Sequence, residues 1–438
     1  MFLSGIFSAQ AQQKTNLSLK DAIEIALSKS DEVGLAATKT ATRNYELSSV
    51  KNNQYPDVKL SGQYLRLTNA DIKLKSSGES SSDPNAEPAA SPKVNQMMLG
   101  QASVTMPIFS GFKLKNSIKA SESEYKAELA NAHYTKEKTA MRVVEYYAEL
   151  YKAQKSVELY KESLKSGQQR VTDFTAMEKN GIIARNDLLK AQLQVSKFQL
   201  SLDDAEKNVR LINYYLITLL KLDPETLIVV SPESISNDLF SFKVQSEAEA
   251  LQNRKDLEAL THLENASKAE IKVAQSGYYP ALSLTGGYVA LDLQNVVRVE
   301  NAMNVGLGLS YNLSSIFKNG KEVKVAKSRA EEVFHQQAIL KDNIKVQIMQ
   351  AKEGYDLSVK QDNVYTEAVA QADENYRIVK DKYDNGLSDT NDLLEADVED
   401  VSAKINQAYA KANVVLKYYE WLEASGQLTQ SFNLTQNK

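Results

Sequence analysis

Two stretches of the chain decide its fold: MEKNGIIARNDLLKAQ at residues 177–192 and KYDNGLSDTNDLLEAD at residues 382–397. In each, an Asn-Gly pair ends one helix and an Asn-Asp-Leu-Leu run begins the next, with Asn186 expected to cap the returning helix in the first stretch. The first stretch and its copy 205 positions later share these residues: Asn180, Gly181, Asn186, Asp187, Leu188, Leu189 and Ala191, matching Asn385, Gly386, Asn391, Asp392, Leu393, Leu394 and Ala396. The chain is therefore expected to build the same helical bend twice.

A second pair of matching segments lies upstream of the bends. YPDVKLSGQYLRL at 55–67 matches YPALSLTGGYVAL at 279–291, with tyrosine, proline, leucine and glycine at corresponding places. Ordered self-similarity of this kind indicates a tandem duplication. We expect the following organisation: one repeat over 12–222 with its bend near 181, a second over 243–427 with its bend near 386, a linker and part of an equatorial region at 223–242, and a disordered tail at 428–438.

Each repeat also carries a pair of predicted strands. They are expected near 57–70 and 94–107 in the first repeat, and near 281–292 and 303–313 in the second, with a low-complexity loop at 76–92. In the last of them, Val305, Leu307, Leu309 and Tyr311 alternate with asparagine, glycine and serine. A period of two with one apolar face is typical of a half-buried strand.

The remaining sequence predicts very long helices. Between Lys113 and Glu178 there is no proline, and this span would measure about 100 Å as one helix. Apolar residues recur there at heptad spacing, which favours coiled-coil packing. The fold class is thus mainly α with a small β part, built from tandem-duplicated long helical hairpins.

The composition excludes several kinds of function. There is no cysteine, the formal net charge is −4, and three histidines are scattered at 133, 262 and 335. These features argue against a disulfide scaffold, a metal site and a nucleic-acid partner. No phosphate-binding loop or nucleophile elbow occurs, so we expect neither an enzyme nor a cofactor. No apolar run reaches the roughly 18 residues of a transmembrane helix.

The N-terminus resembles the end of a secretory signal. Residues 1–11 contain a short apolar stretch and then Ala9-Gln10-Ala11, which has the pattern of a cleavage site. We expect export, with a mature chain beginning near Gln12. The alternative is a disordered N-terminus.

Four strands with one apolar face cannot close into a barrel by themselves. In lipid an open sheet edge is not viable, so several copies would have to pool their strands. Three copies would supply twelve strands, an even number of the kind seen in outer-membrane barrels. The alternative is a small soluble sheet packed on a helical bundle.

The whole plan resembles the outer-membrane efflux proteins, the TolC-like family. The most specific features are MPIFSGFK at 106–113, the Tyr-Pro at the start of each first strand, and the two bends. The second exit, YNLSSIFKNGK at 311–321, lacks the usual proline. The resemblance implies a homotrimer in the cell outer membrane with a long periplasmic part. Twelve strands would form a β-barrel and twelve helices an α-barrel, working as an exit duct with an inner-membrane transporter and a periplasmic adaptor protein.

The resemblance also implies roles for particular residues. Asp392 and Glu395 would form an acidic ring at the aperture. Without the resemblance, the residues themselves favour an ordinary role, with Asp392 complementing the helix dipole and Glu395 a solvated surface charge. Asp187 and Tyr383 would latch the tip, where an arginine of some members falls on Ser388. The adaptor-docking tip would comprise Asn180, Gly181, Ile182, Asn385, Gly386 and Leu387. The lipid-facing barrel residues would be Val305, Leu307, Leu309 and Tyr311.

Three functions are compatible with the sequence. The first is a duct that expels small molecules such as drugs. The second is a dedicated protein-secretion or metal-efflux duct of the same architecture. The third is a soluble coiled-coil scaffold.

Overall fold

The computed structural model describes residues 14–71, 93–230, 242–294 and 296–432. The expected signal remnant, the low-complexity loop and the last six residues of the expected tail lie outside this part of the chain. The chain divides into two compact units. The first comprises 1–40, 127–261 and 336–438, and the second comprises 41–126 and 262–335. Each unit draws on both sequence repeats.

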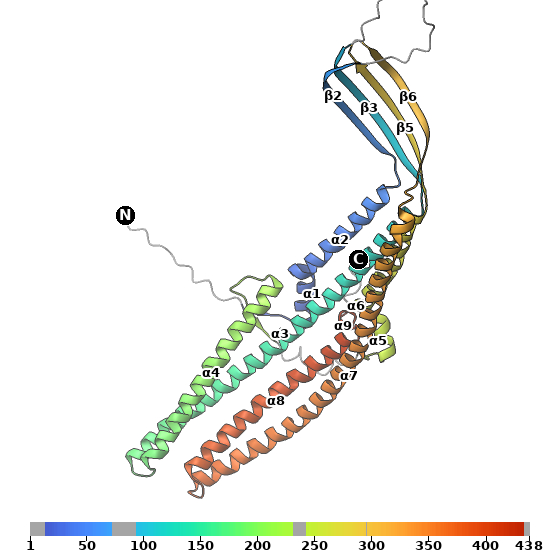
Figure 1. Ribbon diagram of the computed structural model, residues 1–438. Helices are drawn as coiled ribbons and strands as arrows, with labels where there is room; N and C mark the ends of the chain where they lie inside the picture. Colours follow the sequence, from blue (N-terminus) through green and yellow to red (C-terminus); the bar gives the residue numbers. More distant parts are fainter. Residues whose placement is uncertain (1–13, 72–92, 231–241, 295, 433–438) are drawn as a thin grey trace, which may run out of the picture. The chain divides into compact units, whose positions relative to one another are not determined.

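Two long helical hairpins dominate the first unit. One consists of α3 (Lys113–Lys179) and α4 (Arg185–Leu220), and the other of α7 (Ser315–Asp384) and α8 (Thr390–Ala424). Within this unit the hairpins lie side by side and their bends fall at the same end (Figure 1). The predicted tandem hairpins are confirmed, because α3 and α7 run without interruption for 67 and 70 residues.

The main hydrophobic core of the first unit lies far from the bends, and a smaller buried cluster that includes Phe174 and Leu393 lies near them. In the main core, α1 (Leu19–Lys29), which precedes α2 (Asp31–Asn52), packs with α3, α4 and α8 around fully buried Tyr147, Leu216 and Leu422. The Tyr147 hydroxyl donates a 2.8 Å hydrogen bond to the Leu17 carbonyl, which satisfies its polar atom inside this core. A short parallel pair joins β1 (Lys14–Asn16) to β4 (Leu227–Val229).

The C-terminal segment differs from the expected disordered tail. Residues Leu428–Ser431 form a short helix, α9, and Leu428 and Phe432 belong to the core. The Phe432 ring stacks on the Tyr419 ring with centroids 5.2 Å apart. Burial of two apolar side chains thus holds this segment, although its sequence alone is too short and too polar to predict a helix.

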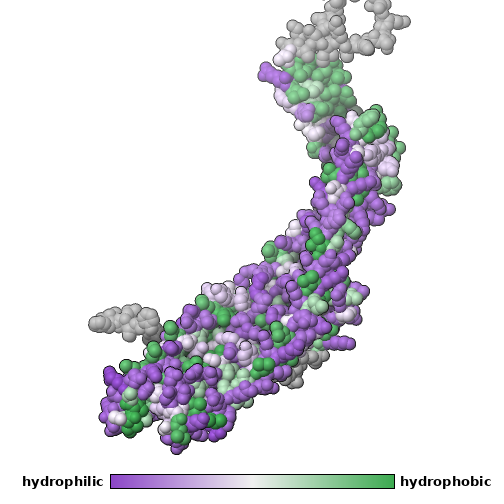
Figure 2. All heavy atoms as spheres, turned by 60° about the horizontal axis from the view of Figure 1, so that its bottom comes forward, coloured by the Kyte–Doolittle hydropathy of each residue, from purple (hydrophilic) through white to green (hydrophobic). Residues whose placement is uncertain are grey.

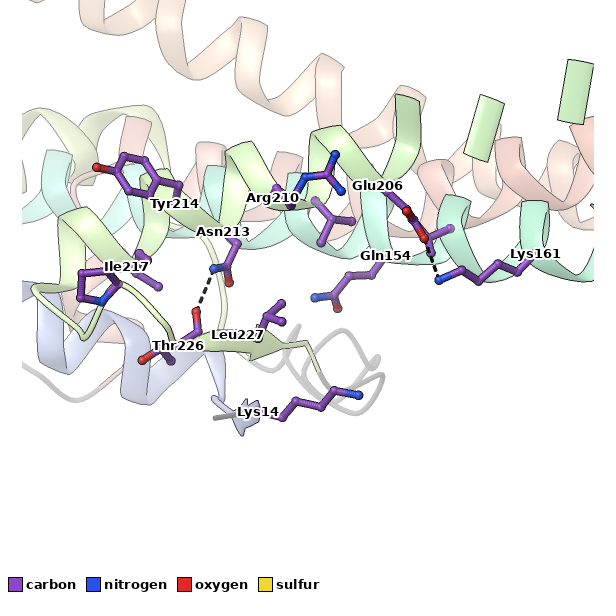
Figure 3. Close-up of a pocket in the computed structure, with 13 residues that line it drawn as sticks. Lys14, Gln154, Lys161, Glu206, Arg210, Asn213, Tyr214, Ile217, Thr226 and Leu227 are labelled. Carbon is purple, nitrogen blue, oxygen red and sulfur yellow. Dashed lines mark hydrogen bonds and ion pairs between the residues drawn. The ribbon is translucent and has the colours of Figure 1, made fainter. Parts of the chain in front are cut away.

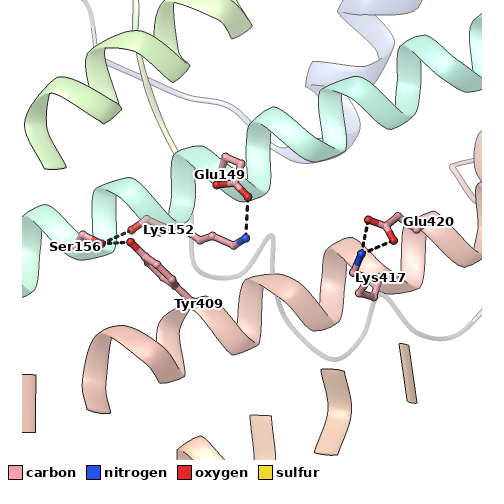
Figure 4. A network of polar contacts seen from close by, with 6 residues as sticks. All are labelled: Glu149, Lys152, Ser156, Tyr409, Lys417 and Glu420. Atoms are coloured by element: carbon pink, nitrogen blue, oxygen red, sulfur yellow. Dashed lines mark hydrogen bonds and ion pairs between the residues drawn. The ribbon is translucent and has the colours of Figure 1, made fainter. Parts of the chain in front are cut away.

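Polar contacts also join α3 to α8 across the two hairpins. The hydroxyls of Ser156 and Tyr409 lie 2.9 Å apart, as Figure 4 shows. Nearby, the ion pairs Glu149–Lys152 and Lys417–Glu420 each stay within one helix (Figure 4). The α3–α8 contact therefore combines a neutral hydrogen bond with charges that are paired locally.

The second half of the chain begins with two helices that lead to the sheet. Helix α5 (Glu247–Asn253) begins with a capping box between Ser246 and Glu249. Helix α6 (Lys255–Gln275) follows and leads, through a 3₁₀ turn at Ser276–Tyr278, to the sheet. No helix within the described ranges has the length and apolar character needed to cross a membrane.

The second unit contains a four-stranded antiparallel sheet. Its strands are β2 (Asp57–Asp71), β3 (Lys93–Ser110), β5 (Ala281–Leu293) and β6 (Val297–Ser310), in the order β2-β3-β5-β6. The predicted antiparallel strands are confirmed, but β6 lies at 297–310 rather than 303–313. Asn301 has a positive φ of 60° and the register shifts nearby, so the alternation that predicts the strand is broken there.

The register fixes which side chains share a face of this sheet. Val58, Val104, Gly286 and Val305 lie on one line of paired residues across the four strands. The adjacent line carries the polar or small residues Asp57, Thr105, Thr285 and Gly306. Because successive residues point to opposite faces, one face is apolar and the other is polar and small.

Candidate functional site

The two bends have the same backbone geometry. Gly181 and Gly386 have φ values of +70° and +72°, which L side chains rarely adopt. The Gly181 amide donates to the Glu178 carbonyl and the next amide donates to the Met177 carbonyl, both at 2.9 Å. The same two bonds recur at the second bend. This is a Schellman motif, so each glycine is required by the way its helix ends.

The returning helices begin differently at the two bends. In α8, the Asp389 carboxylate caps the helix by accepting hydrogen bonds from the amides of Asn391 and Asp392. In α4, the corresponding cap position is Ala184, which makes no side-chain cap bond. The expectation that Asn186 caps α4 is therefore wrong, because α4 begins one residue before it, at Arg185.

The tip of each bend exposes an apolar side chain. Ile182 is 66% exposed and Leu387 is 78% exposed. The side-chain amides of Asn180 and Asn385 turn inward and donate to the carbonyls of Ala176 and Asp381, at 2.8 and 2.7 Å. Each bend is thus stabilised by an internal side-chain hydrogen bond and exposes one aliphatic side chain to solvent.

Acidic residues of α8 divide between its two faces. Asp392 and Glu395 are exposed, whereas Asp397 is buried. At about 100° per residue, Asp397 lies on the side of the helix opposite to Glu395. The Asp392 carboxylate accepts a 2.8 Å hydrogen bond from the hydroxyl of Ser388. The exposed pair therefore faces away from the packed side of its helix.

Asp397 takes part in a buried ion pair between the hairpins. The Arg170 guanidinium on α3 donates to Asp397 on α8 at 2.8 Å and to the Tyr376 hydroxyl on α7 at 3.0 Å. The side chains of Arg170 and Asp397 are only 10% and 9% exposed. Burial lowers the pKa of Arg170, but the hydrogen bonds that its guanidinium donates to Asp397 and Tyr376, together with the negative charge of Asp397, more than compensate, so its pKa is raised and it stays charged.

Tyr383 lies next to this ion pair, near the second bend. Its ring stacks on Phe174 with centroids 5.8 Å apart, and both line a groove of about 720 Å³ with Arg170 and Tyr376. Its hydroxyl is buried and has no hydrogen-bond partner among the described residues. Asp187 lies 3.8 Å from Lys190 on its own helix. The structure therefore does not join Asp187 to Tyr383, and it leaves a phenol without a partner at the tip.

The apolar face of the sheet is open. The four side chains predicted to face lipid are exposed to 81%, 68%, 73% and 40%, in the order Val305, Leu307, Leu309 and Tyr311. Figure 2 shows hydrophobic side chains gathered over the sheet. Contiguous exposed apolar surface of this kind marks a protein or membrane contact.

Comparison with known proteins agrees with this arrangement. The profile of the outer membrane efflux protein family matches residues 22–220 and 248–430, which is most of the chain. The chain belongs to the outer membrane efflux protein family.

Two relatives and one solved structure show how far the likeness extends. The outer membrane efflux protein BepC of Brucella suis is 21% identical over 326 residues, 74% of this chain and 70% of BepC. Nodulation protein T of Rhizobium leguminosarum is 25% identical over 61% of this chain and 56% of that protein. The Campylobacter jejuni CmeC outer membrane channel superposes with a TM-score of 0.79 at 18% identity, covering 97% of this chain and 91% of CmeC. The predicted fold class and family are thereby confirmed.

One further groove of this efflux-family member lies beside β4. It has a volume of about 640 Å³, and its cationic residues are Lys14, Lys161 and Arg210 (Figure 3). Lys161 pairs with Glu206 at 2.8 Å. The Asn213 side chain bonds both the Thr226 carbonyl and the Ile228 amide, at 2.9 Å each. These contacts hold β4 in place, so the polar groups of Asn213 and Lys161 in this groove are used by the fold itself.

Metal ligation finds no support in the part of the chain that the structure describes. There, histidine and carboxylate residues form no group of three or more that could hold an ion. The sequence predicted the bends and the sheet face, but it missed the Arg170–Asp397 pair. A charged residue at a core-facing heptad position is the signal that could have indicated it.

Proposed function

We propose that three copies of this chain form an exit duct of the outer membrane. It would work with an inner-membrane transporter and a periplasmic adaptor to expel small molecules. The observation that carries the proposal is the four-stranded sheet, which has an exposed apolar face and two open edges. In water such a face is an association surface, and in lipid such edges need partners.

The direction of the strands supports closure by like copies. Strand β6 ends, and β2 begins, at the end of the sheet where the helices attach. An antiparallel contact between β6 of one copy and β2 of the next therefore keeps all helices on one side. Such a head-to-tail contact closes into a ring if the rotation allows. Three copies supply twelve strands, within the range of known outer-membrane barrels.

The bends support contact with an adaptor. Each copy brings two tips to the same end of its first unit, so a trimer would present six. Ile182 and Leu387 would supply exposed apolar contacts, with Asn180, Gly181, Asn385 and Gly386 fixing the backbone that carries them. Aliphatic groups on rigid turns suit a protein partner, because the turns lose little conformational freedom on binding.

The acidic pair supports cation preference at the aperture. Asp392 and Glu395 are exposed on the α8 face opposite to buried Asp397. Threefold symmetry would bring about six carboxylates to one constriction, where a fixed negative field attracts cations.

The unpartnered phenol of Tyr383 supports a latch. A buried hydroxyl without a hydrogen bond is unfavourable, so a state that offers it the Asp187 carboxylate would be favoured. Tyr383→Phe keeps the stacking on Phe174 and removes only the hydroxyl. Conductance of the purified protein in a planar bilayer should then rise. Unchanged conductance in both Tyr383→Phe and Asp187→Ala would remove the latch and leave the duct intact.

Cell fractionation and gel migration test the duct itself. The protein should sediment with outer membranes and migrate without boiling as a trimer that heat converts to a monomer. Cells lacking it should accumulate a fluorescent efflux substrate, and the wild-type chain should restore its export. A monomer in the soluble fraction would contradict the proposal and favour a coiled-coil scaffold.

A further inference from the structure

The junction between β3 and α3 forms an apolar pocket with a cationic rim. Its volume is about 530 Å³. The apolar walls are Pro107, Ile108, Phe109, Phe112, Leu114 and Ile118. Lys115 and Lys119 line the same pocket from one face of α3, since they are four residues apart.

The backbone at this junction is strained in a way that shapes the pocket. Gly111 and Phe112 have φ values of +62° and +65°. A side chain on Gly111 would lie 2.7 Å from the Ser276 carbonyl oxygen, so glycine is required there. The positive φ of Phe112 is a strained conformation, because bulky residues avoid the left-handed region.

The strained residue places its ring over an aromatic cluster. Phe112 meets Phe109 and Tyr279 edge-to-face, with centroids 5.2 and 6.4 Å apart, yet it remains 56% exposed. Strain persists where it serves a site, and this ring is held partly in the open. Its position therefore indicates a contact that is not made within one chain.

The pocket is continuous with the apolar face of the sheet. Phe109 pairs with Leu282, which in turn pairs with Leu309 at the last line of that face before the helices. If this face meets hydrocarbon, as the proposed function requires, the pocket lies at the level where the lipid headgroups begin. Aromatic rings and long cationic side chains favour that level.

The two lysines of the rim have no close acidic partner among the residues that the structure describes, although Lys119 attracts the Glu122 carboxylate from a greater distance. Both are exposed, and within the described chain neither makes an ion pair. The nearest acid along the helix, Glu122, pairs with Lys126 at 2.9 Å. An occupant that joins an apolar body to an anionic group would match both the walls and the rim.

We propose that this pocket binds an anionic phosphoglycerolipid from the periplasmic leaflet of the outer membrane. An acyl chain lies against Phe109, Phe112 and Ile118, and the headgroup phosphate accepts hydrogen bonds from Lys115 and Lys119. The inference rests on the proposed membrane function, which supplies the lipid and sets the depth of the site.

Lipid titration followed by native mass spectrometry tests the site. The purified, delipidated protein is titrated with phosphatidylglycerol, in whatever oligomeric state it forms. Each chain should bind one lipid saturably. Lys115→Gln/Lys119→Gln should weaken binding by about fivefold per lysine. The matched control Lys136→Gln/Lys179→Gln lies on the same helix outside the pocket and should bind like the wild type.

Two further arms separate the charge from the apolar body of the ligand. Phosphatidylcholine should bind more weakly than phosphatidylglycerol, and glycerol 3-phosphate alone should not compete. Phe112→Gly relieves the backbone strain and removes the ring, so it should lower lipid affinity while leaving the fold intact. Equal affinity in the Lys115/Lys119 and control variants, or full competition by glycerol 3-phosphate, would overturn the site. A monomer that binds lipid through these lysines would support the pocket and contradict the trimer.

Discussion

Arg170 of α3 donates a 2.8 Å hydrogen bond to Asp397 of α8, and the two residues stand at equal distances from the two bends. Arg170 precedes Gly181 by eleven residues, and Asp397 follows Gly386 by eleven. At 1.5 Å per residue, the pair therefore lies about 16 Å from each tip. It ties one hairpin to the other next to the apolar contacts of Phe174 with Tyr383, so the two tips are held together by a buried charge pair as well as by packing.

The first prediction concerns this ion pair. Asp397→Ala leaves the Arg170 charge buried without its partner and should cost about 3–5 kcal/mol of stability. Denaturant unfolding followed by the fluorescence of Trp421, the one tryptophan of the chain, measures the change. Arg377→Ala removes an exposed pair with Glu374 and should cost far less, because water already solvates both charges. Similar losses in the two variants would contradict the assigned burial. Arg170→Met/Asp397→Leu should recover most of the stability.

The second prediction concerns the uncapped start of α4. Ala184→Asp gives the first bend the cap that Asp389 supplies at the second, and it should raise stability by about 0.5–2 kcal/mol. Asp389→Ala should lower it by a similar amount. The same unfolding assay applies. No gain from Ala184→Asp, together with a loss from Asp389→Ala, would mean that the two bends are not equivalent.

The third prediction concerns pH. Burial raises the pKa of the Glu137 carboxyl above 4.5, although the amide and hydroxyl of Thr429 donate to it. The folded chain then binds this proton more tightly than the unfolded chain does. Stability contributed at this site is greatest below the unfolded pKa and falls as pH rises toward the folded pKa.

Glu137→Gln tests that sign. It should flatten the decline of apparent Tm as pH rises above 4.5, without abolishing it, because burial also raises the pKa of Glu145. Glu158→Gln, at an exposed ion pair with Lys155, serves as the control and should keep the wild-type slope. A steeper decline in Glu137→Gln would refute the assignment.

The fourth prediction concerns the proposed aperture. Asp392→Ala/Glu395→Ala should reduce cation preference, measured as reversal potential under a salt gradient. The difference should shrink at high salt, because charges are screened over about 8 Å at physiological ionic strength. Trimer yield should hardly change, since both side chains are exposed. Equal selectivity at low salt would make these residues ordinary surface charges.

The fifth prediction concerns the two faces of the sheet. Val305→Arg puts a charge on the exposed apolar face and should cost about 2–4 kcal/mol near the middle of a bilayer. Thr105→Arg lies on the adjacent line of paired residues and points to the polar face. Outer-membrane assembly should fall in the first variant and persist in the second. Equal assembly would contradict the proposed orientation.

Local signals made much of this fold predictable. Gly181 and Gly386 sit in bends whose hydrogen bonds span only six residues, so the sequence around them suffices. Val305, Leu307 and Leu309 form their pattern within one strand. In contrast, Arg170 and Asp397 lie 227 residues apart, and nothing local pairs them.

Weaker or broken local patterns account for the remaining differences. The sequence predicts the wrong start for α4 because asparagine is a common capping residue and Asn186 lies near the bend. Ala184 occupies the cap position instead, and its side chain makes no capping hydrogen bond. The start of β6 was missed because Asn301 interrupts the alternation. Leu428 and Phe432 are ordered by a core assembled from distant segments, which a short terminal sequence does not reveal.

The open edges of β2 and β6 also have a genetic consequence. If three copies close one sheet as proposed, a single defective copy spoils the ring it enters. Consider a cell that makes wild-type and Val305→Arg chains in equal amounts, and suppose that the two kinds of chain join at random. Only about one ring in eight would then consist of three wild-type chains. Such an allele would be dominant over the wild type, whereas an allele that never folds would be recessive.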